Sequence, residues 1–168
     1  MTEFTSAILD SQGDVSHWHY VAYDQLNRDL LPDEEGIGLI FIETSWKAKQ
    51  LPYHKQKLAL LLSNQRHFAL EMQDAGYPVK YVFSQKEYGE ILGGICKELG
   101  KITATKPAEL TLRRSLQPLI DSGEIKLLDH KGWLTTSEDF TKGAGQNAPW
   151  RMDKFYRYCL LYTSPSPR

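Results

Sequence analysis

The sequence predicts an α/β domain in which a mainly parallel, five-stranded sheet carries helices on both faces. Three observations lead to this fold class. Short β-rich runs alternate with longer runs that have the apolar spacing of a helix. The strongest run, Ile37–Glu43, is almost continuously apolar, as in a strand buried on both faces of a parallel sheet. Repeated alternation of strands and helices is typical of sheets covered on both sides.

The first strand is expected at Tyr20–Tyr23, after a polar lead-in. Asp29–Gly36 is expected to be a loop, because a proline and a glycine interrupt regular structure there. The second strand is the apolar run itself. After it we expect an irregular connection that ends at Pro52.

A long helix is predicted from Tyr53 to about Ala75, where Gly76 provides a stop. Its apolar stripe has helical spacing and consists of Leu58, Leu61, Leu62, Gln65, Phe68 and Met72. Only Gln65 in this stripe is polar. The stripe therefore predicts that one side of the helix packs on the sheet.

Five further elements complete the alternation. They are the strand Val79–Phe83, the helix Gln85–Leu99, the strand Ile102–Thr105, the helix Pro107–Asp121 and the strand Ile125–Leu128. From Lys131 a Gly-, Thr- and Ser-rich excursion leads to a helix-like segment. We divide the chain into a lead-in (1–18), the α/β domain (19–130), a loop with the start of a helix (131–161) and a tail (162–168) that cannot continue a helix.

The composition indicates an ordinary globular chain and excludes several classes of protein. The 168 residues are 41% hydrophobic, and the formal net charge of −1 gives no electrostatic argument for nucleic acid. Two cysteines provide neither a disulfide framework nor a four-cysteine metal cluster, and they fit a reduced, cytoplasmic setting. No apolar run approaches the roughly 18 residues of a membrane span. The N-terminus has no secretory pattern.

Polar side chains follow the first two predicted strands at the points where the strands end. Asp24 and Gln25 come after the first strand, and Glu43 closes the second. In parallel sheets, ligands bind outside the carboxyl ends of the strands. If the two strands are neighbours, these three residues converge on one crevice.

Simpler explanations exist for each of these residues. Asp24 and its neighbours after a strand often form only an Asx turn. Glu43 at a solvated strand end would pair with Lys47 or Lys49. His17 and His19 place two imidazoles on one side of a strand, but no third metal ligand is evident. No phosphate-binding glycine motif and no catalytic constellation is visible, so we predict no catalytic and no metal residue.

Several segments resemble one known family. "YDQLN" is similar to the Gly-Asp-Gln-Leu opening of photolyase-related proteins, with Tyr23 at the usual glycine. "HKQKLALLLSNQRHF" followed by "AGYPVKYV" is the most specific match, and "WRMDKFYRYCL" resembles a Met-x-x-Phe-Tyr-Arg segment. The family comprises the iron-sulfur bacterial cryptochromes and prokaryotic (6-4) photolyases, and the resemblance covers about residues 19–161.

The resemblance implies a Rossmann-like photolyase N-terminal domain that holds an antenna chromophore, 6,7-dimethyl-8-ribityllumazine. It assigns Asp24, Gln25 and Glu43 to the antenna pocket and Leu61 to the helix face against the lumazine ring. Lys47 lies where some members have an acidic ligand contact. FAD, the iron-sulfur cluster and the damaged DNA would belong to a C-terminal flavin domain that this chain lacks. Residues 162–168 resemble translated adapter read-through, and we expect them to be non-native.

Three functions follow as hypotheses. The first is a truncated antenna domain of a light-driven DNA-repair or blue-light-sensing flavoprotein, whose parent is a DNA photolyase while the fragment itself is not catalytic. The second is a nucleotide-binding α/β enzyme domain, which would be stabilised by ATP or a dinucleotide. The third is a ligand-free docking module in which Trp150 and Phe155 face a partner.

Overall fold

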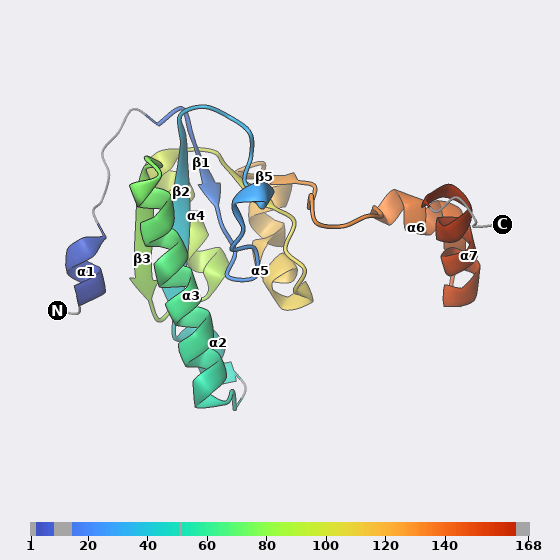
Figure 1. Ribbon diagram of the computed structural model, residues 1–168, viewed down its shortest axis with the longest axis horizontal. Coiled ribbons are helices and arrows are strands. Elements are labelled where there is room, and N and C mark those ends of the chain that lie inside the picture. Colours follow the sequence, from blue (N-terminus) through green and yellow to red (C-terminus); the bar gives the residue numbers. More distant parts are fainter. Residues whose placement is uncertain (1–2, 9–14, 51, 164–168) are drawn as a thin grey trace. The chain divides into compact units, whose positions relative to one another are not determined.

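The computed structural model describes residues 3–8, 15–50 and 52–163 and contains a five-stranded sheet in which every neighbouring pair is parallel (Figure 1). The strand order is β3-β2-β1-β4-β5. The strands are β1 (His17–Tyr20), β2 (Ile37–Thr44), β3 (Val79–Ser84), β4 (Ile102–Thr105) and β5 (Ile125–Leu128). The pairing of β1 with β2 and with β4 places the polar ends of the first two strands side by side, as expected.

The chain divides into two compact units, residues 1–130 and 131–168. The first unit contains the sheet, the short 3-10 helix η1 (Arg28–Leu30), and the helices α1 (Glu3–Ala7), α2 (Trp46–Gln50), α3 (Lys55–Asp74), α4 (Tyr88–Leu99) and α5 (Leu110–Asp121). The second unit contains α6 (Ser137–Ala144) and α7 (Met152–Thr163). Within the described ranges, every helix is too short or too polar to cross a membrane.

Helices cover both faces of the sheet, and β2 alternates between the two cores. Leu39 and Phe41 belong to the cluster that includes α3, whereas Ile40 and Ile42 belong to the cluster that includes α4 and α5. All four side chains are at most 2% exposed. This two-sided burial explains the continuous apolar run in the sequence, and it confirms the predicted α/β fold class with helices on both faces.

The first strand is displaced from its predicted position. β1 spans His17–Tyr20 rather than Tyr20–Tyr23, because its ladder with β2 begins at the pair His17 and Ile37. Val21 and Ala22 are still buried, at 2% and 1% exposure, although they lie beyond the strand. The predicted lead-in 1–18 therefore contains α1 and the start of β1, with residues 9–14 outside the described ranges.

Several other boundaries differ from the predictions. The expected connection after β2 contains the short helix α2. α3 starts at Lys55 rather than Tyr53. α4 and α5 also start later than predicted, at Tyr88 and Leu110, because Glu87 and Glu109 before them have extended backbones. α7 continues to Thr163, so the tail 162–168 begins in a helix, and residues 164–168 lie outside the described ranges.

In the second unit, aromatic side chains connect the segment between α6 and α7 with these two helices. The indole N–H of Trp150 donates to the Gly145 carbonyl at 3.1 Å. Both Trp150 and Phe155 pack edge-on against Phe140, with ring centroids 6.0 and 5.0 Å apart. These two rings, which the docking hypothesis assigned to a partner, thus contact α6 of the same unit.

Candidate functional site

A cavity of about 180 Å³ lies in the first unit, beside the carboxyl end of β2. α2, α3 and α4 contribute to its walls, together with the segment after β1. Its apolar lining comprises Ile42, Ala48, Leu58, Leu61 and Leu62, and tyrosines 23, 53 and 88 add aromatic rings. Such a concave, largely apolar site at strand ends is where parallel α/β domains bind ligands.

The structure brings two of the four predicted site residues to this cavity. Glu43 and Leu61 line it, whereas Asp24 and Gln25 are not part of the lining. Asp24 is exposed. Gln25 is only 2% exposed, and its amide donates to the backbone carbonyls of Thr105 and Lys106 at 3.3 and 3.1 Å. Gln25 therefore ties the end of β1 to the end of β4.

Glu43 is held in place by a bidentate ion pair with Arg66. Its carboxylate oxygens accept from the Arg66 Nε at 2.8 Å and Nη2 at 2.5 Å, and the Tyr81 hydroxyl donates to it at 3.0 Å. The hydrogen bond to Glu43 raises the pKa of Arg66, and burial followed by the Glu43 charge raises that of Tyr81. The pairing with Lys47 or Lys49 that we considered from the sequence is replaced by this ion pair between β2 and α3.

Tyr23, Lys47 and Glu109 form a second polar cluster at the cavity. The Tyr23 hydroxyl donates to the Glu109 carboxylate, and the Lys47 ammonium group contacts both and lies 4.1 Å from the centre of the Tyr23 ring. Burial alone would raise the pKa of Glu109, but hydrogen bonds from Lys47, Thr111 and Tyr23 lower it. Burial raises the pKa of Tyr23, so its hydroxyl stays protonated as a donor. Tyr23 and Lys47 thus occupy one wall of the cavity.

Gln65 also lines the cavity and was absent from the predicted site. Its side chain is 2% exposed on α3, and its Nε2 donates to the Tyr81 hydroxyl at 3.3 Å. The sequence did contain a signal, because Gln65 is the one polar member of an otherwise apolar stripe. A buried carboxamide at that position needs polar partners that the stripe itself does not supply.

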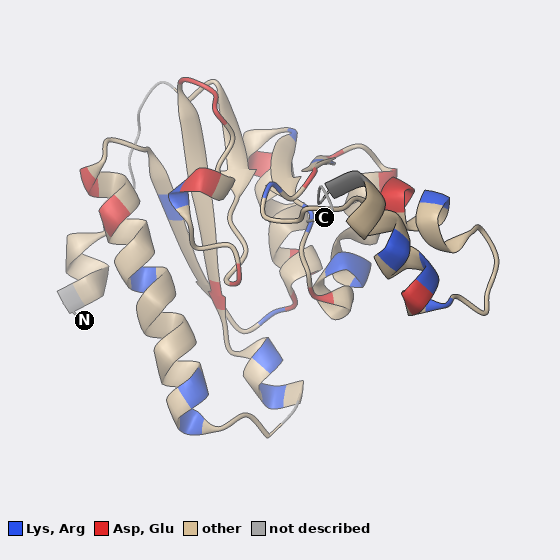
Figure 2. Cartoon of the chain, turned by 45° about the vertical axis from the view of Figure 1, so that its right-hand side comes forward, with Lys and Arg blue, Asp and Glu red and all other residues tan. Residues whose placement is uncertain are grey.

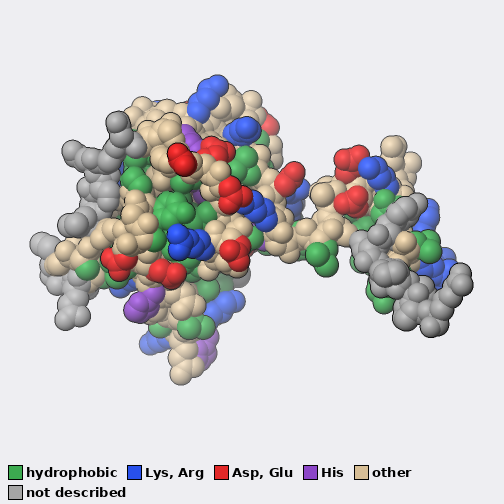
Figure 3. Space-filling model, turned by 45° about the horizontal axis from the view of Figure 1, so that its top comes forward, with side chains coloured by type: hydrophobic (Ala, Val, Ile, Leu, Met, Phe, Trp, Pro, Cys, Tyr) green, Lys and Arg blue, Asp and Glu red, His purple; other side chains and the backbone are tan. Residues whose placement is uncertain are grey.

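Basic side chains gather at the same end of the first unit as the cavity. Lys47 and Lys49 lie on α2, and Lys55 and Lys57 lie in the first turns of α3 (Figure 2). Figure 3 is an oblique view in which the end where the strands begin comes forward, and there acidic and basic side chains are mixed with apolar ones. Lys47 is paired with Glu109, so the positive charge near the cavity comes chiefly from the other three lysines.

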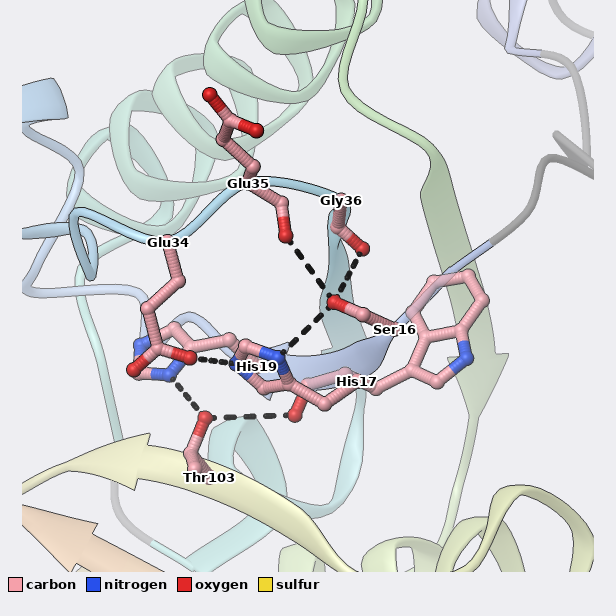
Figure 4. A network of polar contacts seen from close by, with 8 residues as sticks. Ser16, His17, His19, Glu34, Glu35, Gly36 and Thr103 are labelled. Carbon is pink, nitrogen blue, oxygen red and sulfur yellow. Dashed lines mark hydrogen bonds and ion pairs between the residues drawn. The ribbon is translucent and has the colours of Figure 1, made fainter.

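The two histidines of β1 belong to separate polar contacts rather than to one site (Figure 4). His19 is 1% exposed, and its Nδ1 lies 2.9 Å from the Thr103 hydroxyl, which donates to the Trp18 carbonyl at 3.4 Å. The His17 Nε2 lies 3.3 Å from the Glu34 carboxylate. Within the described residues, no three His, Cys, Asp or Glu side chains are arranged to hold a metal ion.

The burial of His19 predicts a pH-dependent stability. Burial, and then the nearby His17, lower the pKa of His19 to about 4 from its ordinary 6.5. The unfolded chain therefore binds this proton more readily, and stability falls as the pH drops from 6.5 to about 4. We expect a loss of roughly 3 kcal/mol over that interval, at about 1.4 kcal/mol per pKa unit.

Urea denaturation of the wild type and of His19→Asn between pH 4 and pH 7 measures this contribution. Asparagine keeps a polar group near the Thr103 hydroxyl but does not titrate. The difference in the free energy of unfolding between the wild type and His19→Asn should shrink as the pH decreases. If the free energies of unfolding of the two proteins change equally with pH, the titration of His19 is not the cause of the pH dependence.

Comparison with known proteins identifies the family. The family model for deoxyribodipyrimidine photo-lyase-related protein matches residues 19–159. A (6-4) photolyase of Agrobacterium fabrum (strain C58 / ATCC 33970) is 23% identical over 134 residues, which are 74% of this chain and 26% of that protein. The chain thus spans about a quarter of the length of this relative. Because the family match covers most of the chain, including β2 to β5 and α2 to α6, the chain belongs to the photolyase-related protein family.

Proposed function

We propose that this chain is the N-terminal antenna domain of a photolyase- or cryptochrome-like flavoprotein that acts in light-driven DNA repair or blue-light sensing. The observation that carries the proposal is the apolar, tyrosine-rimmed cavity beside the carboxyl end of β2. Family membership supports it, because the match includes every element around the cavity. The antenna that we propose is 6,7-dimethyl-8-ribityllumazine.

The chemistry of the cavity fits a flat heteroaromatic ring. Ile42, Leu61 and Leu62 offer apolar contact, and Glu43 and Gln65 offer a few polar groups, as is usual for small-molecule sites. Its 180 Å³ is smaller than the roughly 300–1,000 Å³ of typical ligand pockets. This size favours a compact ring system whose polar substituent extends outward, toward the lysines of α2 and α3, over a larger chromophore.

The work of the domain in this proposal is positioning and the exclusion of water. Leu61 and its neighbours would hold the ring, and the Glu43–Arg66 pair would keep the polar edge of the site fixed. A bound lumazine absorbs blue or near-ultraviolet light and passes the excitation to a flavin. The flavin, the iron-sulfur cluster and the damaged DNA would engage the remainder of a longer cytoplasmic parent protein.

Reconstitution tests the proposal directly. The purified chain is incubated with the lumazine, desalted, and examined by absorption and by fluorescence quenching. A thermal-shift panel with riboflavin, ATP and NAD is run beside it. A retained, quenched lumazine supports the antenna domain. Stabilisation by ATP or NAD alone would favour the nucleotide-binding enzyme domain, and no response to any ligand would favour the docking module.

Substitution of Tyr23 should reveal how far its ring restricts the cavity. We expect Tyr23→Gly to bind the lumazine roughly tenfold more tightly, or by about 1.4 kcal/mol, because it removes a ring that lines the cavity and on which Lys47 rests. Tyr23→Phe keeps the ring volume and serves as the control, with affinity near that of the wild type. Fluorescence titration measures both. Weaker binding by Tyr23→Gly would mean that the ring contacts the ligand instead of obstructing it.

A further inference from the structure

The buried carboxamide of Gln65 has a fixed orientation. The single proton of the Tyr81 hydroxyl is donated to the Glu43 carboxylate at 3.0 Å. The Tyr81 oxygen must therefore accept at its other contact, which is the Gln65 Nε2 at 3.3 Å. The Glu43 carboxylate, which accepts the hydroxyl proton of Tyr81, thus determines which end of the Gln65 amide faces Tyr81.

In this orientation, one acceptor and one donor of the Gln65 side chain remain available at the cavity. Gln65 is 2% exposed and lines the cavity, yet its Oε1 accepts no hydrogen bond from any residue in the described ranges. One of the two Nε2 protons goes to Tyr81, and the second is left over. The Gln65 Oε1 is not one of the enclosed side-chain atoms that lack a partner, so it is accessible from the cavity, where a ligand can complete its hydrogen bonds.

We infer that Gln65 is the specificity-determining residue of the cavity and that it recognises a lactam edge on the ligand. Its Oε1 would accept from a ring N–H, and its Nε2 would donate to the adjacent carbonyl oxygen. A carboxamide matches this donor–acceptor pair with two parallel hydrogen bonds. The inference rests on the proposed function, and it restricts the ligand to heteroaromatic rings with an N–H beside a carbonyl, such as the pyrimidinedione ring of a lumazine.

The same arrangement selects against other aromatic ligands. A ring without the N–H would leave Oε1 unpaired in a water-poor site, and a site with buried polar groups rejects such analogues more strongly than an apolar pocket does. The walls formed by Leu58, Leu61 and Leu62 cannot make this distinction, because they contact any flat ring equally.

A ligand pair and a variant pair test the inference together. The ligands are 6,7-dimethyl-8-ribityllumazine and its N3-methyl analogue, in which the lactam N–H is blocked. The variants are Gln65→Met, which keeps the length of the side chain, and Gln56→Met, a control at an exposed position of the same helix. We expect the wild type and Gln56→Met to prefer the unmethylated ligand by roughly tenfold. Gln65→Met should lose this preference.

The outcomes separate the inference from the proposed function. Equal binding of the two ligands by the wild type, or an unchanged preference in Gln65→Met, would overturn the role of Gln65 while leaving the antenna proposal intact. Binding of neither ligand by the wild type would overturn both. The comparison of the two ligands on the wild type needs no variant, so it decides the question even if Gln65→Met does not fold.

Discussion

Phe41→Ala is expected to lower the free energy of unfolding by about 3–5 kcal/mol, the range for removing a large buried aromatic side chain. Phe41 is fully buried in β2, at 0% exposure. Its ring packs edge-on against Phe68 of α3 and stacks with Tyr81 of β3, with centroids 6.0 and 6.2 Å apart. The substitution therefore leaves a cavity where β2, the edge strand β3 and the long helix α3 meet.

Urea denaturation at neutral pH measures this loss. Leu60→Ala is the matched control, because Leu60 is 61% exposed on α3 and its truncation removes little buried surface. The control should change the free energy of unfolding by less than about 0.5 kcal/mol. A loss below about 1 kcal/mol for Phe41→Ala would mean that the core closes around the missing ring, in contrast to the usual incomplete relaxation.

Most of the sheet could be predicted because the residues of its strands form short apolar, β-rich runs. Ile102–Thr105 and Ile125–Leu128 have the predicted bounds, and β2 extends only one residue beyond its predicted end. β1 lacks such a signal. It contains two histidines and a tryptophan, and His19 is buried only because the Thr103 and Thr105 hydroxyls of β4 approach its ring. That burial depends on a neighbour 84 residues away in the sequence, which no local pattern reveals.

Two of the residues that line the cavity, Glu43 and Leu61, could be placed from the sequence for a related reason. Glu43 ends an apolar strand, and Leu61 lies on an apolar stripe, so their positions follow from local periodicity. The direction of the Gln25 side chain does not, because it depends on β4 lying beside β1. Tyr88 reaches the cavity from α4, a helix on the opposite face of the sheet from α3. Which helices border one cavity is a property of the strand order.

Leu61→Asp should abolish lumazine binding, with an expected loss of at least about a hundredfold in affinity, or about 3 kcal/mol. Leu61 lines the cavity, and a ring bound there would cover its side chain. A carboxylate at this position would lose its water without gaining a partner, and burying an unpaired charge costs several kcal/mol. The charged residues of the lining, Glu43 and Lys47, already have partners in Arg66 and Glu109.

The neighbouring residue provides the control for this prediction. Leu60→Asp introduces the same charge one position earlier on α3, but Leu60 is exposed and is not part of the cavity lining. It should bind the lumazine within about twofold of the wild type, because exposed charges are well screened. Equal losses in the two variants would show that the charge acts on the helix as a whole. Full binding by a folded Leu61→Asp would place the ligand outside this cavity.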